Sequence, residues 1–165
     1  MARPSFSIVM PTYQRRDVVS DAVRALARLR YDGPLEALVV VDGSTDGTAA
    51  ALAEIAVPFP FRVVTQANGG AASARNIGAR AATGEVLLFL DDDMMVDPDI
   101  VEQHARSHLA GADAMLGDIP LEAGSRAGFL SAGVGGRGRP ASAPGRRAPA
   151  AAGAPDLRRL LRRPA

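Results

Sequence analysis

The chain has 165 residues and contains no cysteine, no lysine and no tryptophan. Without cysteine it forms no disulfide bonds and no thiolate metal sites. No apolar run approaches the ~20 residues of a transmembrane helix, and the N-terminus shows no apolar stretch of the secretory type. We therefore expect a chain with no transmembrane segment and a cytoplasmic location.

The charge of the chain is unevenly distributed. The formal net charge is +1, but residues 1–133 carry eleven arginines and seventeen acids, and residues 134–165 carry eight arginines and one acid. Alanine, arginine, glycine and proline fill 26 of those last 32 positions, which leaves too little apolar surface to order a backbone. We expect a folded domain in residues 1–122 and a disordered tail in residues 123–165.

The alternative for the basic tail is an arm that binds nucleic acid or a membrane surface. The tail has no aromatic residue for base stacking and no lysine, so we expect no nucleic-acid partner.

Two kinds of apolar segment alternate along residues 1–122. Short apolar runs predict strands at residues 6–10, 37–41, 61–65 and 85–90, of which 37–41 is a continuous run rich in β-branched residues, with a weaker strand at 112–119. Helical spacing or small-residue content predicts helices at residues 17–30, 47–56, 71–83 and 98–110. Asp97 and Pro98 read as the N-cap and first residue of the last helix. The alternation predicts an α/β fold with a mainly parallel, Rossmann-like sheet and flanking helices, incomplete at the C-terminus.

Three aspartates, Asp91 to Asp93, follow the fourth predicted strand directly. On an extended chain Asp91 and Asp93 point the same way and would converge, and the repulsion between them is relieved by a cation. Oxygen ligands favour Mg²⁺ or Mn²⁺, and Mg²⁺ completes its shell with water and substrate phosphate. The alternative is a solvated acidic turn that caps the next helix.

Polar residues also follow the first two predicted strands, at the edge where a parallel sheet forms its ligand crevice. Asp42 could accept hydrogen bonds from a nucleobase or a ribose, and we expect the nearby Asp46 to cap a helix instead. Tyr13 could stack on a base while Thr12 donates a hydrogen bond, unless Tyr13 is a core aromatic that closes the loop.

Arg75 lies in a segment of small residues that opens the third predicted helix. There it could hold a phosphate or a base edge, or it could be a surface arginine beside the acidic cluster. His104 and His108 are spaced as a metal pair, but without the HExxH pattern we expect both to be exposed helix residues.

The order of four motifs resembles the family 2 glycosyltransferases of GT-A fold. The motifs are SIVMPTYQR, VVVDGSTDGT, NGGAASARNIGAR and GEVLLFLDDDMMVDPD, and the resemblance covers about residues 5–120. It implies a nucleotide-sugar donor, usually a UDP-sugar, and Mn²⁺ or Mg²⁺. The family commonly has two acids before the Gly-Ser of the second motif, and here Val41 occupies the first of these places.

The resemblance also implies roles for individual residues. The residues that would hold the nucleotide are Thr12, Tyr13, Asp42, Arg75 and Asp92. In the family's DxD-type motif, Asp91 and Asp93 would hold the metal, and Asp93 is the expected direct ligand.

The general base that the resemblance implies is a carboxylate well beyond the DxD-type motif, in an acceptor-binding half. Asp118 reads as a strand-end residue near the donor sugar, Glu122 comes too soon, and Asp156 lies in the tail. We therefore expect a donor-binding half without a catalytic base, whose acceptor is an unknown saccharide, lipid or other hydroxyl compound.

This pattern allows several interpretations. A reading-frame shift near residues 125–140 would explain the missing half, and the chain could be inactive alone. A non-catalytic nucleotide-binding or scaffolding module is the alternative function. A nucleotidyltransferase of similar fold ranks last, because its usual glycine-rich loop is replaced here by Pro-Thr-Tyr-Gln-Arg.

Overall fold

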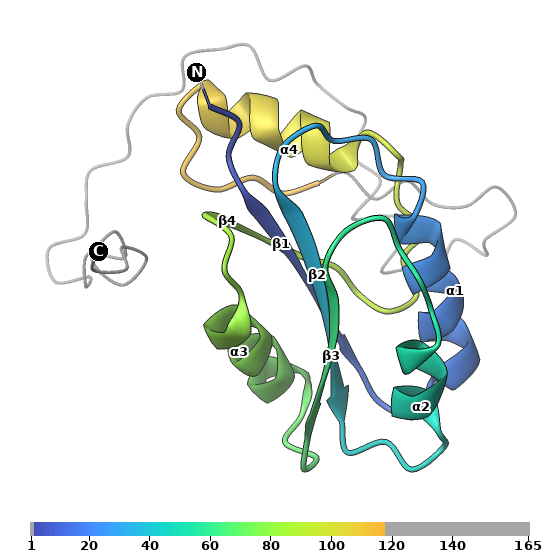
Figure 1. Cartoon of the computed structure of the whole chain (residues 1–165). Coiled ribbons are helices and arrows are strands. Elements are labelled where there is room, and N and C mark those ends of the chain that lie inside the picture. Colours follow the sequence, from blue (N-terminus) through green and yellow to red (C-terminus); the bar gives the residue numbers. More distant parts are fainter. Residues whose placement is uncertain (1, 118–165) are drawn as a thin grey trace, which may run out of the picture. The chain divides into compact units, whose positions relative to one another are not determined.

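The computed structural model describes residues 2–117, so the expected domain boundary at residue 122 and the expected tail lie outside the described residues. Four strands and four helices alternate along this part of the chain (Figure 1). In chain order they are β1 (Phe6–Thr12), α1 (Arg16–Leu26), β2 (Leu35–Asp42), α2 (Thr48–Ala53), β3 (Phe61–Gln66), α3 (Ala71–Ala81), β4 (Val86–Phe89) and α4 (Ile100–Leu109).

The strands form one sheet in the order β3-β2-β1-β4, and every neighbouring pair is parallel. Ile8 of β1 pairs with Ala37 of β2 and with Leu88 of β4. In the sheet, β2 and β3 follow on one side of β1, and β4 lies on the other side of β1. The predicted α/β fold with a parallel sheet and flanking helices is confirmed. The strand order reverses between β1 and β4.

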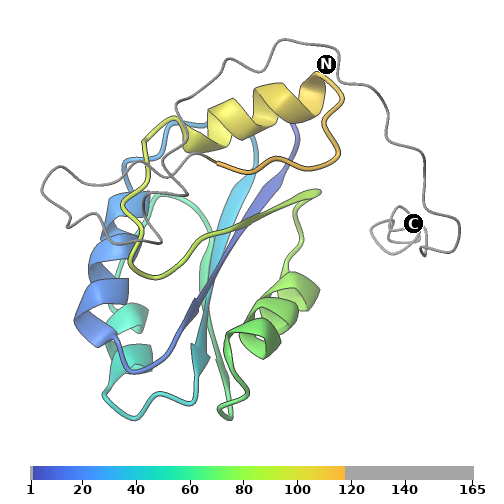
Figure 2. The same cartoon turned by 180° about the vertical axis from the view of Figure 1, so that it is seen from behind.

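Helices cover both faces of the sheet (Figures 1 and 2). Alternate strand residues such as Ile8 and Val39 pack with residues of α1, α2 and α4 in one buried cluster. The opposite face, which carries Val9 and Val40, is covered by α3 at Gly78. Because side chains alternate along a strand, the continuous apolar runs of β1 and β2 supply both faces, as expected for a sheet buried on both sides.

The helices are shorter than the sequence indicated, and two expectations are wrong. The last helix begins at Ile100, because Asp97 and Pro98 form a preceding turn in which Asp97 accepts a hydrogen bond from the N–H of Asp99. Residues 112–117 form no strand, and Leu116 is 93% exposed, so no burial favours an extended pairing there. Within residues 2–117, no helix is long and apolar enough to cross a membrane.

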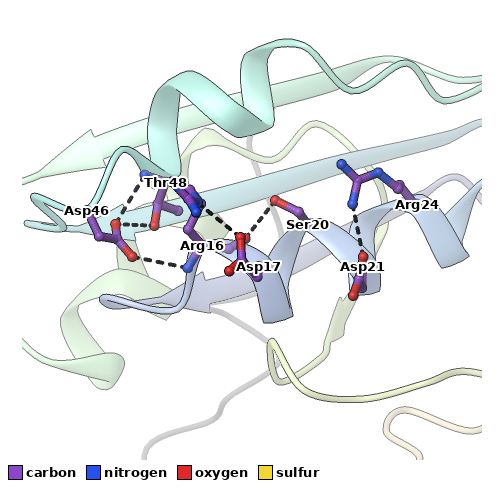
Figure 3. Close-up of polar contacts among 7 residues, drawn as sticks. All are labelled: Arg16, Asp17, Ser20, Asp21, Arg24, Asp46 and Thr48. Atoms are coloured by element: carbon purple, nitrogen blue, oxygen red, sulfur yellow. Dashed lines mark hydrogen bonds and ion pairs between the residues drawn. The ribbon is translucent and has the colours of Figure 1, made fainter.

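Asp46 connects the starts of α1 and α2 (Figure 3). One oxygen of its carboxylate accepts the N–H of Arg16 at 3.1 Å. The other accepts the N–H of Thr48 at 3.1 Å and also the Thr48 hydroxyl. The expected capping role is confirmed, although Asp46 lies one residue before the N-cap Gly47 and serves two helices.

A buried acid, Glu36, lies near the start of β2, at the amino ends of the strands. Its carboxylate accepts hydrogen bonds from the Ser7 hydroxyl at 2.6 Å, from the N–H and hydroxyl of Thr83, and from Arg62 at 3.0 Å. Burial raises the pKa of Glu36, but these donors outweigh it and lower the pKa to about 2. Glu36 therefore ties β1, β2, β3 and the segment after α3 together as an anion.

Candidate functional site

A cavity of about 280 Å³ opens among residues that follow the carboxyl ends of the strands. Open parallel sheets bind ligands at this edge, where the strand order reverses. All seven residues that the sequence singled out for the nucleotide and the metal line this cavity, together with three others. The lining residues are Pro11, Thr12, Tyr13, Arg15, Asp42, Ala71, Arg75, Asp91, Asp92 and Asp93.

Asp42 ends β2 as a buried carboxylate and is only 3% exposed. The N–H groups of Gly69 and Gly70 each donate to it at 2.8 Å, and the Gln66 side-chain amide donates at 2.6 Å. Burial raises the pKa of Asp42, but the donors from Gly69, Gln66 and Gly70 outweigh it and keep the pKa below its usual value. Asp42 is thus an ionised acceptor held by neutral donors in the cavity wall.

The acidic triplet is a turn. The N–H of Met94 donates to the carbonyl oxygen of Asp91 at 3.3 Å, and the strand ends earlier, at Phe89. The expectation that extended backbone makes Asp91 and Asp93 converge is therefore wrong. Among residues 2–117, no three acidic or histidine side chains are grouped closely enough to hold a metal ion by themselves.

The three aspartates differ in exposure and in partners. The Asp92 side chain is 9% exposed, whereas those of Asp91 and Asp93 are 60% and 53% exposed. Asp92 accepts a hydrogen bond from the Thr12 hydroxyl at 2.7 Å, which joins the end of β1 to the turn after β4. The Thr12 hydroxyl proton is therefore directed to Asp92 rather than into the cavity, in contrast to the donor role that we expected for Thr12.

Two arginines pair with the three carboxylates of the triplet. Arg15 Nη1 lies 2.7 Å from Asp92 Oδ1 and 3.1 Å from Asp93 Oδ2. Arg75, on the second turn of α3, pairs with Asp91. Arg75 therefore lies beside the acidic cluster and lines the cavity, and its contact with a phosphate or a base edge stays a prediction.

Tyr13 is 50% exposed at the rim of the cavity, so it is not the core aromatic of the alternative interpretation. Its ring is accessible to a flat ligand.

Arg15 was missed in the sequence. The preceding residue, Gln14, has a φ of 53°, in the left-handed region that residues other than glycine rarely adopt. Hydrogen bonds from its N–H to Ser44 and between its side chain and Thr45 hold it there. The sequence did carry a signal for Arg15. It is a cation two residues after the Thr-Tyr pair at the end of the first strand, in a chain that also has an acidic triplet.

The two histidines of α4 lie outside the cavity lining, and the expectation that both are exposed is wrong. His104 is buried, and burial and the nearby His108 lower the pKa of His104. The apolar face of α4 that carries Val101 and Ala105 also carries His104, which explains its burial.

The family follows from comparison with known proteins. The sequence model of the family described as glycosyl transferase family 2 matches residues 7–131. The chain belongs to glycosyl transferase family 2. The site residues from Thr12 to Asp93 all fall within the matched range.

One relative of the chain is the validoxylamine A glucosyltransferase of Streptomyces hygroscopicus subsp. limoneus. It is 36% identical over 117 residues, which are 68% of this chain and 26% of that protein. The chain spans between 26% and 42% of the length of the curated relatives compared.

Two solved structures share the fold. S. aureus TarS 1–349 in complex with UDP-GlcNAc has a TM-score of 0.56 at 29% identity, over 62% of this chain and 31% of that one. The mannosyltransferase PcManGT from Pyrobaculum calidifontis, in complex with GDP-Man and Mn²⁺, has a TM-score of 0.54 at 30% identity, over 60% and 30% of the two chains.

The donor set suits a hard divalent cation, because the cavity offers carboxylate oxygens and no nitrogen or sulfur ligand. Asp91 and Asp93 are accessible, and Mg²⁺ commonly binds through only one or two carboxylates when a phosphate completes its shell. The residues therefore fit a metal that binds together with a phosphorylated ligand.

Proposed function

We propose that this chain binds a nucleoside-diphosphate sugar, with uridine as the nucleoside, together with Mn²⁺ or Mg²⁺, for transfer of the glycosyl group to a hydroxyl acceptor. The observation that carries the proposal is the single cavity that holds Asp42, both arginines and the acidic triplet. The membership of the chain in family 2 supports the reaction type.

The charges in the cavity favour one orientation of the donor. Asp42 has only neutral hydrogen-bond donors, so its negative charge is not cancelled and would repel a phosphate. It suits the N–H of a base, and the accessible ring of Tyr13 suits the face of that base. Arg15, Arg75 and the triplet line the rest of the cavity and suit the diphosphate with its cation.

Asp91 and Asp93 are the proposed metal ligands, since they are the exposed carboxylates of the triplet. When bound, the metal would neutralise the charge that develops on the departing diphosphate. Thr12 and Arg15 would act on Asp92 and hold the turn that presents its two neighbours. Arg75 would place a guanidinium beside the phosphates.

The acceptor and the general base remain unassigned. The later acids Asp118, Glu122 and Asp156 lie outside the described residues. The cytoplasmic location likewise stays a prediction, as does the division into a domain of residues 1–122 and a tail.

Calorimetric titration of the full chain with UDP in the presence and absence of Mn²⁺ tests the donor site. We expect Mn²⁺-dependent binding that weakens at least about tenfold in Asp42→Asn and in Asp91→Asn with Asp93→Asn, because each change removes charge-assisted contacts. Asp21→Asn, at an exposed ion pair on α1, is the matched control. Absence of nucleotide binding by the unaltered chain would refute the site.

Incubation with a panel of UDP- and GDP-sugars then separates the two candidate functions. Release of sugar or its transfer to an added acceptor supports a glycosyltransferase. Nucleotide binding without any turnover supports the non-catalytic binding module.

A further inference from the structure

Gln66, the last residue of β3, touches the candidate site without lining it. Its side-chain nitrogen donates to Asp42 Oδ1 at 2.6 Å and to the Ser73 hydroxyl on α3 at 3.3 Å. Its side-chain oxygen is buried and has no hydrogen-bond partner, and among residues 2–117 no other buried side-chain nitrogen or oxygen atom is in that situation.

An orphaned amide oxygen is unfavourable, because a buried acceptor loses its hydrogen bonds to water. An apolar side chain of similar length, such as leucine or methionine, would avoid that cost. The Gln66 amide therefore stabilises the fold no better than an apolar side chain would at this position. Its role lies in the contact with Asp42.

The contact with Asp42 limits what this carboxylate can still accept. An ionised carboxylate has about four acceptor positions, two on each oxygen. Oδ1 already accepts from the Gly69 N–H and from Gln66, and Oδ2 accepts from the Gly70 N–H. One acceptor position remains, on Oδ2.

Nucleobases differ in how many donors they would present to that position. Uracil has one ring N–H, flanked by two carbonyl groups. Guanine has a ring N–H and an adjacent exocyclic amino group that point in the same direction. With one free position on Asp42, the single N–H of uracil is paired, while guanine leaves one of its two donors unpaired in a buried setting, which disfavours binding.

We propose that Gln66 is a specificity-determining residue, which occupies an acceptor position of Asp42 and thereby selects a base with one N–H over guanine. The inference rests on the proposed function, in which Asp42 faces the base. Gln66 acts through Asp42, so it is a positioning residue rather than a catalytic one. The neighbouring backbone is built closely around it, since a Cβ on Gly69 would lie 2.9 Å from the Ser73 hydroxyl and 3.2 Å from the Gln66 nitrogen.

The test compares GDP with inosine diphosphate, because the two differ only in the exocyclic amino group. Both are titrated calorimetrically into the full chain with saturating Mn²⁺, beside UDP as the reference ligand. The unaltered chain is expected to bind inosine diphosphate about fivefold or more tightly than GDP, the factor for a buried donor left unpaired. A chain that binds UDP but prefers GDP over inosine diphosphate would overturn the inference without any variant.

Gln66→Leu and Gln66→Met remove the donor and free the second acceptor position. Both are expected to bring the two purine affinities to within about twofold, mainly through tighter GDP binding. Gln103→Leu makes the same chemical change at an exposed site on α4 and should keep the original ratio. Two variants of Gln66 are used because either one alone could fail to fold.

The possible failures are distinguishable. If the unaltered chain binds neither UDP nor a purine nucleotide, the proposed function fails. If UDP binds and the ratio of the two purines is near one in the unaltered chain, Asp42 does not face the base, so the inference and the proposed donor orientation fail while nucleotide binding at the site stands. If the ratio does not change in the Gln66 variants, only the role of Gln66 fails.

Discussion

Arg15 and Asp92 form an ion pair of 2.7 Å although 77 residues separate them in the chain. The pair joins the loop after β1 to the turn after β4, the two strands between which the sheet reverses its direction. The Thr12 hydroxyl makes a second connection to the same carboxylate. Arg15 thus holds the two sides of the cavity together, and it also pairs with Asp93, one of the two proposed metal ligands.

Replacement of Arg15 by glutamine should therefore raise the affinity of the nucleotide-free chain for Mn²⁺. The arginine competes with the metal for Asp93, and its removal leaves Asp92 and Asp93 without a cationic partner while Arg75 still pairs with Asp91. We expect about a threefold to tenfold tighter Kd for Mn²⁺, within the range of exposed and half-buried ion pairs.

Titration of free Mn²⁺ by electron paramagnetic resonance measures this change. Arg24→Gln, which removes an exposed i,i+3 pair with Asp21 on α1 (Figure 3), is the matched control and should leave the Mn²⁺ affinity unchanged. An Arg15→Gln chain that binds Mn²⁺ no better than the unaltered chain would show that Arg15 does not compete with the metal.

Glu36 should make the stability of the fold depend on acid pH. Its pKa is about 2 in the folded chain and near 4.5 ordinarily, a depression that corresponds to about 3 kcal/mol of stability at neutral pH. Because the folded-state pKa is the lower one, this stability is complete above about pH 5 and is lost as the pH falls toward 2.

Urea unfolding at a series of pH values measures this contribution. Glu36→Gln should lower the free energy of unfolding by about 2–4 kcal/mol at pH 7, and the difference from the unaltered chain should shrink as the pH approaches 2. Glu54→Gln, at an exposed position after α2, should show neither effect. A gap between Glu36→Gln and the unaltered chain that stays constant with pH would contradict the assignment.

The sequence was sufficient for the fold because its signals were local. The β-branched runs of β1 and β2 are buried on both faces, and that burial pattern predicts parallel strands independently of their partners. The last helix was placed two residues too early, because Asp97-Pro98 is a good helix start and only the backbone shows that it forms a turn first.

The candidate site was predicted less completely, for a physical reason. Strand-end position identified Asp42 and the triplet, since it depends only on where each strand stops. The pairing of Arg15 with Asp92 depends on β4 lying beside β1, and the contact of Gln66 with Asp42 depends on the register between β2 and β3, in which the two residues are partners. Such contacts between distant segments leave no periodic signal in a single sequence.

The two-sided cap at Asp46 predicts a graded series of variants. Asp46→Ala removes acceptors for both α1 and α2, whereas Asp46→Asn keeps one acceptor oxygen and can serve only one helix. We expect Asp46→Ala to lower Tm by about 4–8 °C and Asp46→Asn by roughly half as much. Scanning calorimetry measures both, with Asp21→Asn as the control (Figure 3); equal losses in Asp46→Asn and Asp46→Ala would refute the shared cap.

Gly78 allows α3 to lie directly on the sheet, and this close approach predicts a compensating pair of substitutions. A Cβ at Gly78 would lie 2.3 Å from a methyl carbon of Val9 and 3.2 Å from one of Val40, so α3 must move outward and carry Arg75 with it. Although alanine favours helix, Gly78→Ala should cost about 1–3 kcal/mol of unfolding free energy.

Val9→Ala removes the methyl carbon that Gly78→Ala would strike. The double variant should therefore be more stable than the sum of the two single changes predicts, by about 1 kcal/mol or more in a double-mutant cycle measured by urea unfolding. UDP affinity should fall in Gly78→Ala and recover in the double variant, because the position of Arg75 follows that of α3. Additive free energies would mean that α3 does not depend on this contact for its distance from β1.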